Sequence, residues 1–311
     1  PAMLRTSLLY LSRQQRVFDF VKNVGFARKM ASRFVAGETI STAVEAVAQL
    51  NAKGIAASLD LLGESVHSEA EARATGRHYL EILDRIHERQ LNANVSVKLT
   101  ALGQDISDDL GVEVVREVIA RARQYDSFVR LDMESSAYTD RTLDTFEQHL
   151  FPGFENHVGI VLQSSLRRTL DDVARANRLS ARVRICKGAY LEPPDVAFPD
   201  KADVDKNYVA AMHTLLTEGR YPGIATHDEA IIAEAKRFAK AQGIAPDRFE
   251  FQMLYGVRRD LQEQIVKEGY RMRVYVPFGS QWYPYLMRRL AERPANIAFM
   301  AGNIVKESLG S

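Results

Sequence analysis

Four polar residues near the carboxyl end could together bind a small carboxylate. Tyr285, Arg288, Arg289 and Glu292 stand at i, i+3, i+4 and i+7, so in a helix they share one face. Two adjacent guanidiniums offer planar, fixed charge that matches a carboxylate, and Glu292 is placed to hold one of them. The alternative is a solvated helix face, since most charged stripes on amphipathic helices are only surface.

A strand is expected directly before this helix. Residues 271–279 read Arg-Met-Arg-Val-Tyr-Val-Pro-Phe-Gly, a run with strand character that Pro277 and Gly279 close. Residues 280–284 then lead into the helix. The four polar residues should therefore lie close to the carboxyl end of a strand.

The rest of the chain alternates short apolar runs with segments of helical period. We predict eight strands, at residues 55–63, 94–99, 128–133, 158–163, 181–187, 223–226, 249–254 and 272–276. Eight such units in roughly 250 residues predict an α/β fold, a closed (β/α)8 TIM-like barrel. An open doubly wound sheet is the runner-up, but no Gly-x-Gly-x-x-Gly turn follows any strand to indicate a Rossmann dinucleotide site.

The segments outside the barrel are predicted as follows. Residues 3–36 have a helical pattern, and a capping box at residues 41–45, with Ser41 at the cap, predicts another helix before the first strand. We expect a single domain overall, with an N-terminal helical segment at 1–40 and a barrel catalytic domain at 41–311. A loop with three prolines at 191–200 is a candidate rim or lid.

Nearly every predicted strand ends in polar residues. In a barrel these ends meet at one mouth, where the chemistry gathers. A lone Gln or Thr there is better explained as a structural polar group, but convergence from so many strands favours an active site. The residues are Asp60, Lys98, Asp132, Glu134, Gln163, Arg184, Lys187, Thr226, His227, Asp228, Gln252 and Tyr275.

Composition excludes several classes of function. With 41 basic and 40 acidic side chains the net charge is +1, which gives no electrostatic footprint for nucleic acid or an anionic bilayer. The single cysteine, Cys186, rules out an internal disulfide framework and fits a reducing, cytoplasmic setting. The seven histidines lack metal-ligand spacing, so we predict no metal site. No apolar run approaches the roughly 18 residues that span a bilayer, and no cleavable leader is recognisable.

Several motifs resemble those of the proline dehydrogenase family. The longest is Tyr-x-Pro-x-Gly at 275–279 followed by Tyr-x-x-Arg-Arg-x-x-Glu at 285–292. The similarity covers roughly residues 40 to 300, and Arg293-Pro294 departs from the usual pattern after the glutamate. The other motifs are Ser-Val-Lys98-Leu, Leu-Asp132-Met-Glu134, Arg184-Ile-Cys-Lys187-Gly188-Ala189-Tyr190, Ala-Thr226-His227-Asp228 and Gln252-Met-Leu254-Tyr-Gly.

The resemblance implies a fold, a cofactor and a reaction. The fold would be a distorted barrel whose last helix lies over the mouth, and the cofactor would be non-covalently bound FAD. The enzyme would oxidise L-proline to Δ1-pyrroline-5-carboxylate by hydride transfer to flavin N5, the first step of proline catabolism to glutamate. A quinone would accept the electrons, and because no membrane helix is predicted, the chain would dock at most peripherally, at the inner face of the membrane. A homo-oligomer is compatible with the sequence.

The resemblance also implies roles for single residues. Arg288, Arg289 and Lys98 would bind the substrate carboxylate, and Leu254, Tyr275 and Tyr285 would enclose the ring. Two residues are expected to be catalytic: Arg184 would lie close to flavin N5, and Asp132 would sit near Lys98 and fix the charge balance. The cofactor-binding set would be Met133, Gln163, Arg184, Lys187, Gly188, Ala189, Thr226, His227 and Glu292.

Two other functions are open on the residues alone. Lys98 or Lys187 at the mouth could form a Schiff base, as in a (β/α)8 aldolase, which needs an amine of lowered pKa. A barrel that merely binds a carboxylate would show neither flavin colour nor turnover. A yellow protein that L-proline bleaches would separate the dehydrogenase from both.

Overall fold

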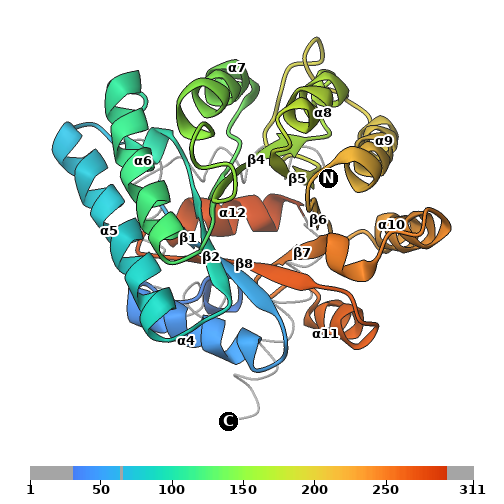
Figure 1. Cartoon of the computed structure of the whole chain (residues 1–311), viewed down its shortest axis with the longest axis horizontal. Coiled ribbons are helices and arrows are strands. Elements are labelled where there is room, and N and C mark those ends of the chain that lie inside the picture. The colour runs from blue at the N-terminus through green and yellow to red at the C-terminus, as the bar shows by residue number, and fades with distance from the viewer. Residues whose placement is uncertain (1–30, 64–65, 293–311) are drawn as a thin grey trace.

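A closed barrel of eight parallel strands forms the centre of the molecule (Figure 1). The computed structural model describes residues 31–63 and 66–292. Each strand pairs with its sequence neighbours, and β8 pairs with β1 to close the ring. The predicted barrel is confirmed. The strands are β1 (Ala56–Leu61), β2 (Ala93–Val97), β3 (Val129–Leu131), β4 (Val158–Gln163), β5 (Arg182–Cys186), β6 (Gly223–Ala225), β7 (Glu250–Leu254) and β8 (Met272–Phe278).

Helices between consecutive strands form the outer ring seen in Figure 1. Short helical turns at Thr100–Leu102, Phe146–Leu150 and Pro246–Arg248 lie in the connections. The ring helices are α5 (Glu69–Glu88), α6 (Asp108–Gln124), α7 (Ser136–Thr145), α8 (Thr169–Arg178), α9 (Lys201–Glu218), α10 (Glu229–Ala241) and α11 (Arg259–Lys267).

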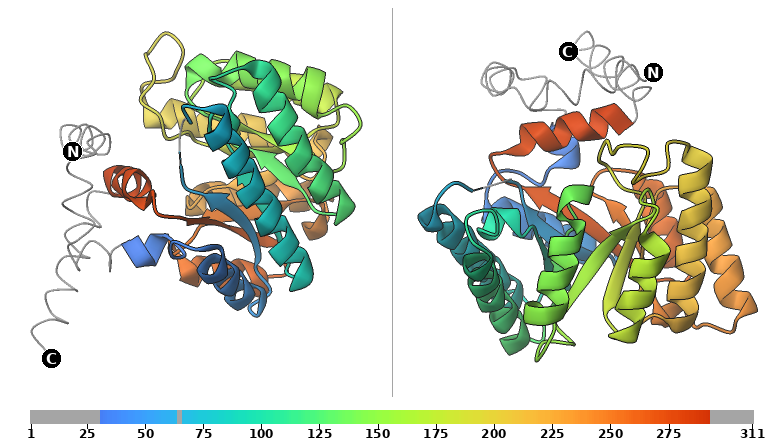
Figure 2. Two further views of the ribbon diagram at one scale, coloured as in Figure 1. Left: turned by 90° about the vertical axis from the view of Figure 1, so that its left-hand side faces the viewer. Right: turned by 90° about the horizontal axis from the view of Figure 1, so that it is seen from above.

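The helix after β8 does not join this ring. α4 (Ile40–Asn51) instead packs on β1 and β8, where these two strands pair and close the barrel. α12 (Trp282–Glu292) starts soon after β8 ends and lies across that end of the barrel (Figure 2). Since all eight strands are parallel, this end is the carboxyl mouth. The expectation of a last helix over the mouth is confirmed.

The start of α4 differs from the sequence prediction. The cap is Thr39, whose side chain accepts from the backbone N–H of Thr42, while the Thr42 hydroxyl is bonded to the Thr39 backbone. Ser41, which we expected at the cap, is the second residue of the helix. Thr39 has the hydroxyl that a helix cap favours. Its hydrogen bonds with Thr42 satisfy backbone groups at the first turn, which therefore begins two residues earlier than predicted.

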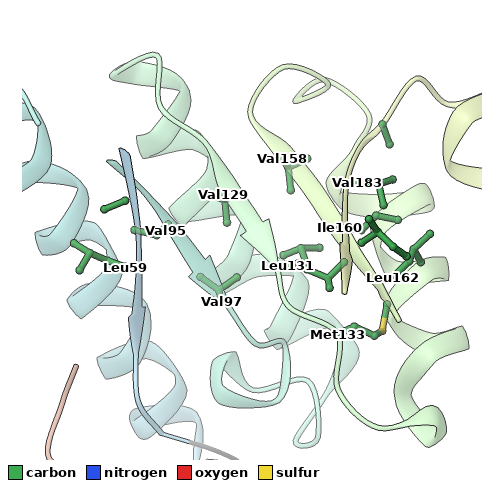
Figure 3. Close-up of a cluster of buried hydrophobic side chains, with 14 of the residues drawn as sticks. Leu59, Val95, Val97, Val129, Leu131, Met133, Val158, Ile160, Leu162 and Val183 are labelled. Atoms are coloured by element: carbon green, nitrogen blue, oxygen red, sulfur yellow. The ribbon is translucent and has the colours of Figure 1, made fainter. Parts of the chain in front are cut away.

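The two sides of each strand have different environments. Outward-facing side chains pack between barrel and helices as an apolar core, with Leu59, Val97, Leu131 and Ile160 among the side chains drawn in Figure 3. Ile160 and its neighbours are almost inaccessible to water. The inward-facing side chains carry polar and charged groups, which the alternation of strand side chains places inside the barrel. They include Ser58, Ser96, Arg130, Arg184, Glu250 and Gln252.

A buried ion pair lies inside the barrel. Arg273 Nε donates to Glu250 Oε1 at 2.7 Å, and Arg273 Nη2 donates to Oε2 at 3.2 Å. Burial alone would raise the pKa of the Glu250 carboxyl, but Arg273, together with Gln252 and Arg130, outweighs burial and holds that pKa below its usual value. The ionised form of Glu250 therefore stabilises the folded state.

Glu250→Gln should lower the free energy of unfolding by about 3–5 kcal/mol at pH 7, because Arg273 would keep a buried, uncompensated charge. A depressed folded pKa gives stability above the unfolded pKa, about 4.3, that is lost as pH falls through the folded value. The deficit of the variant should therefore shrink below about pH 4.3 in urea unfolding experiments. Glu263→Gln, at an exposed pair with Lys53, is the matched control and should change little. A deficit independent of pH would contradict this account.

Three sequence predictions stay predictions. Residues 1–30 lie outside the described residues, so most of the predicted N-terminal helix does too, although 31–34 are helical. The division at 40 and 41 stays a prediction. The loop at 191–200 is tied to the start of α7, where Glu192 accepts from the Ser136 backbone N–H at 2.7 Å; its role as a lid also stays a prediction. Among the described residues, no helix combines the length and apolar character of a bilayer span.

Candidate active site

Arg184 is held by three side chains in the barrel interior. Its Nε donates to Gln252 Oε1 at 2.5 Å, Nη1 to Asp132 Oδ1 at 2.7 Å and Nη2 to Ser96 Oγ at 3.0 Å. The Tyr275 ring lies 5.4 Å from the guanidinium carbon. Three of the five N–H donors of an arginine are thus used. The contacts fix the guanidinium plane and leave two donors for a ligand.

Asp132 joins Arg184 to Tyr275. Its Oδ1 accepts from Arg184, and its Oδ2 accepts from the Tyr275 hydroxyl at 2.8 Å. Burial raises the pKa of Tyr275 well above its ordinary value, and the charges of Asp132 and Asp60 add to this effect. Tyr275 therefore stays a neutral donor at the pH values at which enzymes work.

Lys98 has a different partner from the one expected. Its Nζ lies 3.3 Å from both carboxylate oxygens of Asp60, whereas Asp132 was the residue predicted near it. Parallel pairing of β1 with β2 sets Asp60 opposite Ser96, which brings the Lys98 ammonium within reach of Asp60. Asp132 acts on Lys98 only through its charge.

The Lys98 amine is protonated in this setting. Burial favours the neutral amine, but the charges of Asp60 and Asp132 outweigh burial and raise the pKa of Lys98 above its usual value. Arg288 lowers the same pKa, so its positive charge lies near enough to act on Lys98. A raised pKa suits the binding of a carboxylate and is the opposite of what a Schiff-base lysine needs.

The polar face of α12 is not a solvated stripe. Tyr285 is only 5% exposed, and Arg288 and Arg289 are half-buried. The guanidinium of Arg289 lies 5.1 Å from the centre of the Tyr285 ring, a distance at which cation–π attraction operates. Arg288 also lowers the pKa of Lys98, which places its charge at the barrel mouth. The side chain of Glu292 lies outside the described residues, so its role stays a prediction.

The residues expected to hold the flavin ring lie at the ends of β3 and β4. Gln163 Nε2 donates to the backbone carbonyl of Glu134 at 2.9 Å, and Met133, which directly precedes Glu134, is buried. Gly188 has a φ of +105°, and a Cβ there would collide with Ser165 Oγ and lie 3.2 Å from Gln163 Oε1. A glycine is thus required at this point of the mouth.

The residues expected near the ribityl chain and phosphates follow β5 and β6. Lys187 lies 2.5 Å from Asp205 and 2.9 Å from Asp228, so its charge is already shared with two carboxylates. Thr226 Oγ1 accepts from the Asp228 backbone N–H at 3.0 Å. Ala189, half-buried, follows Gly188 in the same loop.

His227 links the loop after β6 to the end of β7. Its Nε2 lies 3.0 Å from the Leu254 backbone N–H and accepts from it. The other ring nitrogen therefore carries the proton when the imidazole is neutral. This bond fixes the end of β7, where Leu254 is half-buried at the mouth.

Several side chains that support the site were not predicted from the sequence. Asp60 and Gln252 were noted as polar strand ends but given no role, whereas Ser96 and Glu250 were passed over. A polar residue at alternate positions of an otherwise apolar strand was the available signal for Ser96. Among the described residues, no three His, Cys, Asp or Glu side chains cluster as a metal site requires.

Comparison with known proteins decides the family. The family model for proline dehydrogenase matches residues 43–302. The chain is 47% identical over 280 residues to a proline dehydrogenase of Deinococcus radiodurans, covering 89% of this chain and 90% of that protein. The chain belongs to the proline dehydrogenase family. Proline dehydrogenase 1 of Bacillus subtilis is 42% identical over 305 residues, which are 98% of this chain and all of that protein.

The structural likeness extends to proline dehydrogenase domains within larger proteins. Proline utilization A of Bdellovibrio bacteriovorus, in a structure inactivated by N-propargylglycine, is similar with a TM-score of 0.82 and 27% identity. The match covers 98% of this chain and 38% of that one. Proline utilization A of Bradyrhizobium japonicum gives a TM-score of 0.74 over 88% of this chain and 32% of that chain. Membership of the family makes the chain an oxidoreductase, and the roles of its single residues stay predictions.

Proposed function

We propose that this proline dehydrogenase oxidises L-proline to Δ1-pyrroline-5-carboxylate with non-covalently bound FAD, as the first step of proline catabolism to glutamate. The observation that carries the proposal is the fixed Arg184 guanidinium in the barrel interior, beneath the mouth that α12, the helix of Arg288 and Arg289, lies across (Figure 2). An oriented cation below and a carboxylate-binding pair above are what oxidation of a small cyclic amino acid requires.

The residues at the mouth fit a flavin. The exposed backbone at Gly188 comes so close to Ser165 and Gln163 that a Cβ is excluded, which holds this loop beside the Gln163 amide. Gln163, Arg184 and the backbone after Met133 would bind the isoalloxazine. FAD, when bound, accepts a hydride at N5. The residues for the ribityl chain and phosphates would be Lys187, Gly188, Ala189, Thr226 and His227.

The substrate would be oriented by its carboxylate. Arg288 and Arg289 would bind it from α12, and Lys98, protonated because of Asp60 and Asp132, would add a third positive charge. A cluster of fixed charge favours a carboxylate over a neutral amide. Leu254, Tyr275 and Tyr285 would enclose the ring and exclude water and larger analogues.

Two residues would act on the reacting end of the substrate. Arg184 would supply positive charge where negative charge develops during hydride transfer. Asp132 would keep Arg184 and Tyr275 in fixed orientations through its two oxygens. Arg184 is buried and Tyr275 is half-buried, and holding both in place limits the reorganisation needed during the reaction.

The route of the electrons after flavin reduction rests on the family resemblance. We propose a quinone as the acceptor, with the protein in the cytoplasm and docked peripherally at the inner face of the membrane. A homo-oligomer is also part of this proposal. The Schiff-base aldolase has no supporting observation, since Lys98 is ion-paired with a raised pKa and Lys187 lies between two carboxylates.

Purified protein tests the proposal directly. We expect flavin absorption bands, release of FAD on denaturation, and formation of Δ1-pyrroline-5-carboxylate from L-proline with an artificial quinone as acceptor. Incubation with borohydride and a 2-oxo acid such as pyruvate should leave no covalent adduct on Lys98 or Lys187 in the mass spectrum, because a Schiff base needs a carbonyl substrate. A colourless protein that borohydride traps would overturn the dehydrogenase in favour of the aldolase.

A further inference from the structure

The side chains inside the barrel form a hydrogen-bonded series that ends on Arg184. Arg273 holds both oxygens of Glu250. Gln252 Nε2 donates to Glu250 Oε1 at 2.7 Å, and Gln252 Oε1 accepts from Arg184 Nε at 2.5 Å. Tyr221 adds a hydroxyl donor to Glu250 Oε2 at 3.0 Å. The series runs from the amino end of β7 and β8 toward the mouth.

Glu250 determines which way the Gln252 amide faces. An ionised carboxylate only accepts hydrogen bonds, so it binds the NH2 end of the amide and turns the carbonyl oxygen to Arg184. If the amide were flipped, its NH2 would face the Arg184 guanidinium and its oxygen would face a carboxylate, leaving both contacts repulsive. Glu250 and Gln252 are each 4% exposed, so water is not at hand to replace either bond.

The neighbouring strand β6 confines the Gln252 side chain. A Cβ built on Gly223 of β6 would lie 2.6 Å from Gln252 Nε2. Gly223 is aligned with Glu250 across the β6–β7 ladder, so its missing side chain provides the space that the amide occupies. The Gln252 side chain is thus confined in position as well as in orientation.

We propose that Gln252, oriented by Glu250, is a positioning residue that sets the plane of the Arg184 guanidinium for the reaction. The inference rests on the proposed function, in which Arg184 faces the reacting atoms. Gln252 itself is placed in the barrel interior, beyond Arg184, and acts only through it. Loss of the Nε contact frees the guanidinium to rotate about its stem, and a misplacement of about 1 Å at a reacting centre can cost about 100-fold in rate.

Gln252→Met tests this proposal with two measurements on the full chain as purified. The first follows the Arg184 Nε–H signal in NMR spectra of protein with labelled arginine, identified by its absence in Arg184→Lys. We expect its exchange with solvent to become at least about 10-fold faster in Gln252→Met, because the proton loses its acceptor. This measurement does not require flavin or turnover.

The second measurement follows flavin reduction by L-proline in stopped flow. Gln252→Met should slow reduction by about 10-fold to 100-fold, while the Kd of a cyclic carboxylate without nitrogen stays within about twofold, since Arg288, Arg289 and Lys98 are untouched. Gln104→Met is the matched control, because Gln104 is a buried glutamine whose amide donates to Thr145 outside the site. It should change neither readout.

Gln252→Glu separates positioning from general packing. A protonated glutamic acid can donate to Glu250 and present its carbonyl oxygen to Arg184, as the amide does. We expect the rate to recover at lower pH and to fall as pH rises, because two adjacent carboxylates cannot both ionise without repulsion. A structural role alone would not give this pH dependence.

The outcomes distinguish this proposal from the proposed function. An Arg184 signal unchanged in Gln252→Met, or a reduction rate equal to that of Gln104→Met, would overturn the positioning role. Absence of flavin reduction in the wild-type protein would overturn the proposed function instead, and the NMR result would still decide whether Gln252 holds Arg184.

Discussion

Arg288→Met and Arg289→Met should each weaken L-proline binding by about 2–5 kcal/mol, or about 30-fold to several thousand-fold. Methionine keeps much of the apolar stem but removes the charged fork from a half-buried position over the mouth. The Kd of L-proline, measured by titration of the flavin spectrum, gives the loss. The fold should survive because both arginines lie on the helix across the mouth and not in the barrel wall.

Two comparisons make this prediction specific. Arg288→Lys should recover only part of the loss, since a point charge cannot reproduce a planar fork. Arg85→Met, on the exposed face of α5, is the matched control and should leave binding unchanged. If a cyclic carboxylate without nitrogen keeps its affinity in Arg288→Met while proline oxidation falls, the arginines serve the cofactor and not the substrate.

Arg184→Lys should slow flavin reduction by about 100-fold to 1,000-fold with a much smaller change in the Kd of L-proline. Lysine keeps the charge and compensates Asp132, but it cannot form the three directed contacts that hold the guanidinium. Stopped-flow reduction over a range of L-proline concentrations separates the limiting rate from the Kd. An effect confined to the Kd would reassign Arg184 to substrate binding.

Arg184→Met removes both the charge and the hydrogen bonds of the guanidinium, whereas Arg184→Lys keeps the charge. It would leave the Asp132 carboxylate buried without its cation, so we expect the free energy of unfolding to fall by about 3–5 kcal/mol as well. Arg184→Lys should largely avoid that loss. Equal stability of the Met variant and the wild type would contradict the role of Arg184 as the partner of Asp132.

The sequence predicts the strands because their pattern is local. Apolar runs bounded by turn residues mark each strand, and β4 has the bounds that its pattern indicated, Val158–Gln163. The start of α4 was placed two residues late because Thr39 and Ser41 are both good caps. Only the hydrogen bonds that each can form in the folded chain decide between them.

Partners within the site are harder to predict than the strand ends. That Lys98 and Asp132 stand at the mouth follows from strand periodicity, but the Lys98–Asp60 pair depends on the register of β1 against β2, which no local pattern reveals. The ion pair of Glu250 with Arg273 was missed because a barrel interior is normally filled by apolar side chains. Buried charge that is paired across strands has no signature in either strand alone.

The central claim is that fixed charge over the mouth selects a carboxylate and presents it to a flavin. Anaerobic addition of L-proline, D-proline or L-prolinamide to the purified protein, followed at the flavin absorption band, tests it most directly. We expect rapid bleaching by L-proline and none of comparable rate by the other two, because D-proline has the wrong configuration and L-prolinamide lacks the carboxylate charge. Bleaching by L-prolinamide as fast as by L-proline would contradict the claim.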